Sequence, residues 1–410
     1  MTPPLTPAKP EPSFSEFVAM MAACMALTAL GVDTMLPALP LMGIDLKAES
    51  QNHLQWVVVA FFSGAGAGQL LFGTLSDWLG RKRVLLFGIL AYIIMSVAAA
   101  AATELWALIL LRFLQGIAAA SASVVPRSIV RDRYAGSTMA KVMSMIYVVF
   151  LLVPVLAPSL GQVILFVLPS WRAIFLILAG AGIIVALWIW RRLPETLPVE
   201  RRNPPNPAHL KRVSAFIITE RTSLCYSLAI TFMTATIVAY ISLMPQIFNE
   251  SFKAPQLLAP IFAVCAIGMA VGSVLNARIV ERLGSRRISH IALSVFNVTA
   301  LAHWLWAVTG HESLISFIIF QTLTMACMSL STSNFAAISM EKVGHVAGTA
   351  ASLQGVTSMV GGAIIGSFIG QHWTGDVALL PLGAALCGAV AFGLVFLAEK
   401  GHLYGRATAS

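Results

Sequence analysis

Long apolar segments recur along almost the whole chain, separated by short polar stretches. A helix that crosses the ~30 Å hydrocarbon core of a membrane needs about 20 apolar residues, and twelve segments come close to or exceed that length. Only 10% of the 410 residues are charged, which excludes a soluble enzyme because soluble domains carry about 25%. We therefore predict an all-α membrane protein. The expected spans are residues 17–41, 54–79, 84–102, 105–130, 139–166, 172–190, 222–248, 255–280, 288–308, 313–338, 346–371 and 377–397.

The longest polar stretch divides these spans into two sets of six. Residues 191–221 contain five prolines and seven basic side chains, a composition typical of a linker. The predicted organisation is a tail over 1–16, a six-helix bundle over 17–190, the linker over 191–221, a second six-helix bundle over 222–398 and a tail over 399–410.

The two halves also repeat in sequence. Shifting the chain by 204 residues aligns the second span of one half with the second span of the other. Parallel repeats of this kind place a substrate site between the halves, near the middle of the membrane. The fold expected is therefore a pair of pseudo-symmetric six-helix bundles. The matched pairs include Gly64 with Gly268, Gly68 with Gly272, Asp77 with Glu281, Gly80 with Gly284 and Lys82 with Arg286.

Basic side chains fall mostly in loops that share one predicted side of the membrane. Because such an excess marks the cytoplasmic side, we expect a multi-pass protein with both termini in the cytoplasm. The formal net charge of +9 has the same origin and does not indicate a nucleic-acid partner. The five cysteines stand singly, so neither a disulfide framework nor a metal site is expected.

Residues 73–83 read Gly-Thr-Leu-Ser-Asp-Trp-Leu-Gly-Arg-Lys-Arg at the end of the second span. This segment resembles the G-x-L-x-D-x-x-G-R-K/R signature of the major facilitator superfamily. Asp77 can pair with Arg81, and the resemblance implies a contact with the start of helix 11 that stabilises the outward-open state. Glycine permits close helix packing and a left-handed turn at the helix end. The expected conformational switch comprises Gly73, Asp77, Gly80, Arg81 and Lys82.

Two further segments resemble motifs of the same family. The residues Arg112-Phe113-Leu114-Gln115-Gly116 resemble its R-x-x-Q-G motif. In the fifth span, two prolines four residues apart favour a bend and a following glycine allows close packing, as in the family's antiporter motif. That motif supports antiport over symport, although Ala157 and Gln162 replace two residues of the usual pattern. Its members here are Pro154, Ala157, Pro158 and Gly161.

Residues 31–40, Gly-Val-Asp-Thr-Met-Leu-Pro-Ala-Leu-Pro, resemble the D-x-x-L-P-A-L-P segment of Bcr/CflA-type drug/proton antiporters. Residues 126–132, 171–175 and 193–197 suggest the same group. The resemblance implies a monomeric exporter in a bacterial inner membrane. Its substrates would be small lipophilic drugs, such as chloramphenicol-type or bicyclic antibiotics and sulfonamides, or related metabolites. The proton gradient would drive it, without a cofactor.

Asp33 is the one acid that lies well inside an apolar run, and burying a charge there costs several kcal/mol without a partner or function. Counted along ideal helices, Asp33 lies ~12 Å and Arg112 ~10 Å from the outer ends of their spans. The two are plausible partners, directly or through water. Desolvation disfavours the carboxylate and a guanidinium favours it, so a site that is alternately wetted could load and release a proton. We predict that Asp33 carries the proton and that Arg112 modulates it.

Other functions remain open from the residues alone. A facilitator would not need Asp33, and a membrane-embedded enzyme would gather several His, Asp or Glu residues on one side. The chain has no G-K dipeptide and hence no P-loop, which disfavours an ATP-driven pump. We expect a transporter rather than an enzyme. Aromatic side chains could face its cavity or pack between helices, and the candidate substrate contacts are Asp33, Phe61, Tyr147, Phe150 and Tyr240, followed by Phe62 and Phe232.

Overall fold

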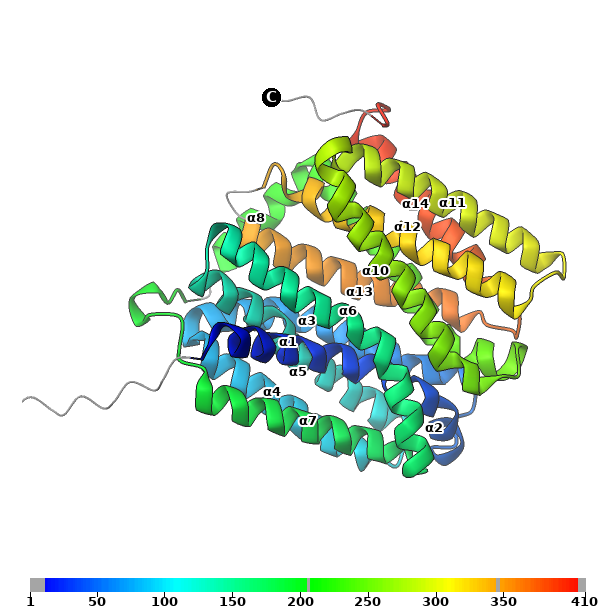
Figure 1. The fold of residues 1–410 in the computed structure, drawn as a ribbon, viewed down its shortest axis with the longest axis horizontal. Helices are drawn as coiled ribbons and strands as arrows, with labels where there is room; N and C mark the ends of the chain where they lie inside the picture. The colour runs from blue at the N-terminus through cyan, green and yellow to red at the C-terminus, as the bar shows by residue number, and fades with distance from the viewer. Residues whose placement is uncertain (1–11, 205–206, 344–346, 405–410) are drawn as a thin grey trace, which may run out of the picture.

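The computed structural model describes residues 12–204, 207–343 and 347–404, and within these ranges the regular structure is helical (Figure 1). The outer parts of the predicted tails, 1–11 and 405–410, lie outside the described residues, as do 205–206 and 344–346. Twelve helical segments of the described chain are long and apolar enough to cross a membrane. The prediction of an all-α membrane protein with twelve spans is confirmed.

The helices form two bundles joined by a linker. In the first half lie α1 (Phe14–Asp33), α2 (Leu39–Asp45), α3 (Gln55–Leu79), α4 (Arg81–Ala100), α5 (Leu105–Arg133), α6 (Gly136–Val167) and α7 (Trp171–Arg192). The linker carries α8 (Pro207–Thr219). In the second half lie α9 (Arg221–Gln246), α10 (Leu258–Leu283), α11 (Ser285–Val308), α12 (Leu314–Met340), α13 (Ala347–Gln371) and α14 (Leu379–Ala398).

Each half packs mainly on itself, and the halves meet where α3 contacts α13 and α6 contacts α10. Figure 1 shows the first bundle in blue to green and the second in lime to red, with their long helices side by side. The repeat is visible in the packing. A Cβ atom built on Gly68 would lie 2.5 Å from the carbonyl oxygen of Ile117 in α5, and one on Gly272 would lie 2.5 Å from that of Ala326 in α12.

The first span is interrupted. We expected one continuous helix over 17–41, whereas α1 ends at Asp33 and a 3₁₀ turn at Leu36–Ala38 leads into the short α2. Pro37 is the physical cause, because a proline has no N–H to donate and its ring clashes with the carbonyl four residues earlier, here that of Asp33. The break leaves the Asp33 side chain at the C-terminal end of a helix inside the protein.

We call the two ends of the helical bundle the linker end and the distal end. The linker end holds α8 and the α3–α4 turn, and the distal end holds α2 and the α9–α10 connection.

The helix α8 was not predicted, because prolines and basic residues dominate the linker sequence. Val213 and Ile217, four residues apart, form its buried face and pack with Val343 and Ala350.

Candidate functional site

A cavity of about 220 Å³ lies between the two halves, as the sequence repeat predicted. Asp33 supplies the one carboxyl group among the lining side chains of the described chain, and almost all the others are apolar. The first half supplies Thr28, Ala29, Val32, Asp33, Phe61, Phe62, Ala65, Phe150 and Pro154. The second half supplies Ile237, Tyr240, Ile241, Phe262, Cys265, Ala266, Met269, Met325 and Met359.

Asp33 reaches this cavity from the broken end of α1. Its side chain is 4% exposed and makes no ion pair with any described residue. Removing a carboxylate from water is unfavourable unless a partner replaces the water. Asp33 is therefore a buried carboxyl group that a molecule in the cavity can contact.

Arg112 is fully buried in α5 but does not pair directly with Asp33. Its Nη1 donates to Gln115 Oε1 at 2.6 Å, and its Nε donates to the carbonyl oxygen of Val57 at 3.3 Å. These two bonds hold the guanidinium within the first bundle, so of the two predicted arrangements, direct or through water, the direct contact is not formed. Its Nη2 has no hydrogen-bond partner among the described residues. The R-x-x-Q-G motif thus forms a polar cluster next to the cavity.

Phe61 is shared by the arginine cluster and the cavity. The Cζ atom of Arg112 lies 4.3 Å from the centroid of the Phe61 ring, a cation–π geometry. Phe61 also lines the cavity that contains Asp33. Phe61 thus contacts Arg112 and also forms part of the wall of the cavity that contains Asp33.

The remaining predicted substrate contacts divide into two groups. Phe61, Phe62, Phe150 and Tyr240 line the cavity. Tyr147, whose side chain is 40% exposed, and Phe232 are not among the lining residues.

The sequence reasoning missed part of the cavity wall in the second half. The missed residues have no periodicity or local motif that separates them from ordinary packing residues of an apolar helix. They include Phe262, Met269, Met325 and Met359.

The predicted antiporter motif lies against the break in α1. A Cβ atom on Gly161 would lie 2.0 Å from the carbonyl oxygen of Thr34, the residue after Asp33. Pro154 lines the cavity, Ala157 is buried, and both Pro154 and Pro158 lie inside α6. The motif therefore sets how closely α6 approaches the segment that carries Asp33.

The predicted switch motif forms an ion-pair cluster at the linker end. Arg81 Nη1 lies 2.5 Å from Asp77 Oδ1, and Arg81 Nε lies 2.8 Å from Asp132 Oδ2. Gly80 has φ +104°, the left-handed conformation that favours glycine. Gly73 and Asp77 also line a cavity of about 340 Å³ together with Thr349, near the start of α13. The motif thus borders helix 11 of the transmembrane count.

Glu195 completes this cluster, a role that the sequence did not reveal. Its carboxylate accepts hydrogen bonds from the backbone N–H groups of Arg81 at 2.8 Å and Lys82 at 3.2 Å. A carboxylate at a helix N-terminus satisfies free donors and the positive end of the helix dipole. Lys82 Nζ in turn donates to the carbonyl oxygen of Trp190 at 2.9 Å. The linker is thereby bound to the start of α4.

Amide side chains join the two halves at the distal end. Gln55 Nε2 donates to Gln246 Oε1 at 2.5 Å, and Gln246 Nε2 donates to Asn52 Oδ1 at 2.8 Å. Gln371 Nε2 donates to the carbonyl oxygen of Asn52 at 2.8 Å. We call Asn52, Gln55, Gln246 and Gln371 the distal latch.

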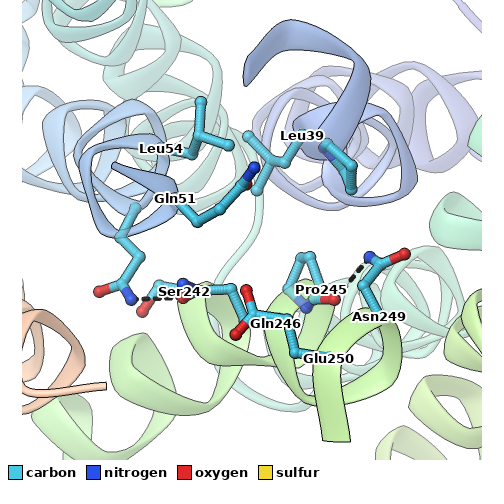
Figure 2. A pocket seen from close by; sticks show the side chains of 10 residues that line it. Leu39, Gln51, Leu54, Ser242, Pro245, Gln246, Asn249 and Glu250 are labelled. Carbon is cyan, nitrogen blue, oxygen red and sulfur yellow. Dashed lines mark hydrogen bonds between the residues drawn. The ribbon is translucent and has the colours of Figure 1, made fainter. Parts of the chain in front are cut away.

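A second cavity lies beside the distal latch. This cavity has a volume of about 380 Å³. In Figure 2, Leu39, Gln51 and Leu54 lie opposite Ser242, Gln246 and Glu250. Its walls come from both halves, as do the hydrogen bonds of the latch. The latch therefore holds the two halves together on the distal side of Asp33.

Comparisons with known proteins agree with this architecture. A model of the Major Facilitator Superfamily matches residues 21–367. The chain is 30% identical over 374 residues to the uncharacterized MFS-type transporter YdgK of Bacillus subtilis, covering 89% of this chain and 92% of that protein. It is 26% identical over 357 residues to the bicyclomycin resistance protein homolog of Haemophilus influenzae, covering 86% and 88%.

A solved structure shares the fold at low sequence identity. The D-xylose–proton symporter superposes with a TM-score of 0.75 at 13% identity, covering 94% of this chain and 99% of that one. The bicyclomycin resistance relative agrees with the Bcr/CflA-type resemblance of residues 31–40. With twelve spans, two repeated bundles and a family match over most of its length, the chain belongs to the major facilitator superfamily, a family of membrane transporters and not of enzymes.

Proposed function

We propose that this protein is a proton-coupled antiporter that exports small lipophilic drugs or related metabolites by alternating access. The observation that carries the proposal is Asp33, a buried carboxyl group without an ion-pair partner in a largely apolar cavity between the halves. Proton binding and substrate binding would compete for this group, which exchanges one for the other across the membrane. The drug-resistance relative supports the substrate class.

Alternating access would use two of the contacts between the halves, the distal latch and the seam between α3 and α13. The distal latch closes one end, and the seam between α3 and α13 runs from Gln55 beside Gly370 to Gln69 beside Gly355. Opening the latch while closing the linker end would expose Asp33 to the distal side. The Asp77–Arg81 cluster lies where that second closure would occur.

We infer the placement of the protein from its charges. The linker end carries Arg81, Lys82 and Arg83 together with the basic linker, and such residues favour the cytoplasm. The proposed location is the bacterial cytoplasmic membrane with both termini inside. In this proposal the protein works as a monomer in the lipid bilayer, driven by the proton gradient and without a cofactor.

The test is proton-driven drug uptake into inverted membrane vesicles. We expect wild type to accumulate substrate against its gradient and a protonophore to abolish the accumulation. Asp33→Asn should transport less than a tenth as much at equal expression, because the amide cannot release a proton. Glu200→Gln, which removes an exposed acid of the linker, is the matched control. Wild-type accumulation by Asp33→Asn would contradict the proposal.

The same assay separates the alternatives. A facilitator would equilibrate the drug without accumulating it and would ignore the protonophore. Accumulation of a metabolite, without accumulation of the drugs tested, would instead identify an exporter of an endogenous compound.

A further inference from the structure

The hydroxyl group of Tyr240 is buried at the central cavity without a nitrogen or oxygen partner in the described chain. Tyr240 belongs to α9, is 3% exposed and lines the cavity, and its Oη meets only the thiol of Cys265, a weak hydrogen-bonding group. Its ring stacks on Phe262 with the centroids 5.4 Å apart and an interplanar angle of 27°. Packing therefore holds the ring in place while its polar atom is unsatisfied, an arrangement that is unfavourable unless a ligand supplies the missing bond.

Asp33 is the complementary group on the other half. It also lines the cavity and lacks an ion-pair partner among the described residues. The other polar side chains in the wall are occupied: Thr28 donates to the carbonyl oxygen of Ala119 at 3.0 Å, and the Cys265 thiol lies 3.8 Å from the Thr322 hydroxyl. Asp33 and Tyr240 are thus the two polar groups of the described wall that remain available to a bound molecule.

The chemistry of these two groups restricts what the cavity holds best. An ionised carboxyl group only accepts hydrogen bonds, and a phenol hydroxyl can donate one. An alcohol or a secondary amide offers both a donor and an acceptor, so it can satisfy both groups at once. A lipophilic cation without hydrogen-bonding atoms would leave the Tyr240 hydroxyl unsatisfied, and an anion would be repelled by the Asp33 carboxylate.

We propose that Asp33 and Tyr240 together bind a hydroxyl or amide group of the substrate, and that this makes the cavity selective for compact lipophilic alcohols and amides. The inference rests on the proposed export function and deepens it. Because Asp33 lies on α1 and Tyr240 on α9, such a substrate connects the two halves. A cavity of about 220 Å³ suits a small molecule of this kind.

The test measures binding to the purified full-length protein by isothermal titration calorimetry. Chloramphenicol, which has two hydroxyl groups and a secondary amide, is compared with tetraphenylphosphonium, a lipophilic cation that cannot form hydrogen bonds. Tyr240→Phe removes only the hydroxyl and retains the ring on Phe262. We expect it to weaken chloramphenicol binding about tenfold and to leave tetraphenylphosphonium binding within about twofold.

Tyr134→Phe is the matched control, because Tyr134 packs against Phe14 and Phe17 at the linker end, away from the cavity. It should change neither affinity. An equal loss of both ligands in Tyr240→Phe would show a structural role for Tyr240 and overturn the inference. Unchanged chloramphenicol binding would overturn it as well.

Failure of this binding inference can be distinguished from failure of the proposed export function. If wild type exports tetraphenylphosphonium with proton coupling but does not bind chloramphenicol, the selectivity inference fails and the export function stands. If chloramphenicol binds through Tyr240 but no compound is accumulated in vesicles, the binding site stands and antiport fails.

Discussion

The guanidinium carbon of Arg112 lies 4.3 Å from the centroid of the Phe61 ring, and that ring lines the cavity holding Asp33. The guanidinium of Arg112 in α5 therefore contacts the ring of Phe61 in α3 and not the carboxyl group of Asp33 in α1. This arrangement keeps a buried cation stabilised by its neighbours Gln115 and Val57 while Asp33 remains free to bind another partner.

Phe61→Leu should weaken proton-driven transport. It removes a cation–π contact worth roughly 0.5–2 kcal/mol, so Arg112 would be less well held beside the cavity. We expect a several-fold loss of proton-driven uptake and near-wild-type uptake in Phe61→Tyr, which keeps the aromatic face. Phe368→Leu, at a side chain 68% exposed on α13, is the control. Wild-type uptake by Phe61→Leu would show that the ring contact is not needed.

Arg112→Lys should impair coupling more than substrate binding. A lysine has no planar fork and cannot keep the bonds to both Gln115 and the Val57 carbonyl. We expect the number of protons moved per substrate to fall in a fluorescence-quench assay, while the affinity for substrate stays within a few fold. Equal losses of both quantities would indicate a folding defect.

Gly161→Ala should disturb the approach of α6 to the break in α1. The added Cβ would lie 2.0 Å from the carbonyl oxygen of Thr34, so the backbone must shift. Overpacking of this kind destabilises by about 1–3 kcal/mol. We expect a lower unfolding temperature in detergent and a loss of transport. Gly180→Ala in α7 has no heavy atom within 4 Å of the added Cβ and should behave as wild type.

Gln55→Leu should open the distal end more often. It removes hydrogen bonds to Gln246 and to the carbonyl oxygen of Gly370, together worth about 1–3 kcal/mol. A cysteine introduced by Asn249→Cys, beside the distal cavity, should then react about fivefold faster or more with an impermeant maleimide in intact cells.

Two features of the chain provide controls for that labelling experiment. Gln51→Leu alters the wall of the same cavity without removing a hydrogen bond of the latch. It should leave the labelling rate unchanged. The native cysteines are all buried and should contribute little background. Unaltered labelling in Gln55→Leu would mean that the latch does not control access.

Glu195→Ala should loosen the start of α4. The change leaves the backbone N–H groups of Arg81 and Lys82 without their carboxylate acceptor. Loss of a capping group typically costs about 0.5–2 kcal/mol, so the unfolding temperature should fall by a few degrees. Glu200→Ala, at an exposed linker acid, should have no effect, and an equal shift in both variants would exclude a specific cap.

The twelve spans, their division into two repeated halves and the helix end within residues 73–83 were all predictable. Each membrane-spanning helix needs its own apolar segment of sufficient length, so the spans can be read from the sequence one at a time. A residue such as Gly80 marks a helix end through its own backbone conformation. Asp33 was identifiable for the same reason, as an acid that interrupts an otherwise apolar run.

The surroundings of Asp33 could not be predicted in this way. Its place at a helix end depends on how Pro37 is accommodated, and the orientation of Arg112 depends on bonds to Gln115 and Val57. Met269, Met325 and Met359 line the cavity from the second half. In a helix that is apolar all round, the sequence does not show which residues face a cavity and which face lipid or another helix.

The sequence by itself determined the membrane class, the two-fold repeat and the identity of the buried acid, since each follows from composition and spacing along one helix. Only the tertiary structure decided that Arg112 contacts Phe61 in place of Asp33, that Tyr240 faces the cavity unsatisfied, and that amides join the halves at the distal end. These relationships join residues far apart in the chain, and packing between helices selects among many contacts that the sequence alone permits equally.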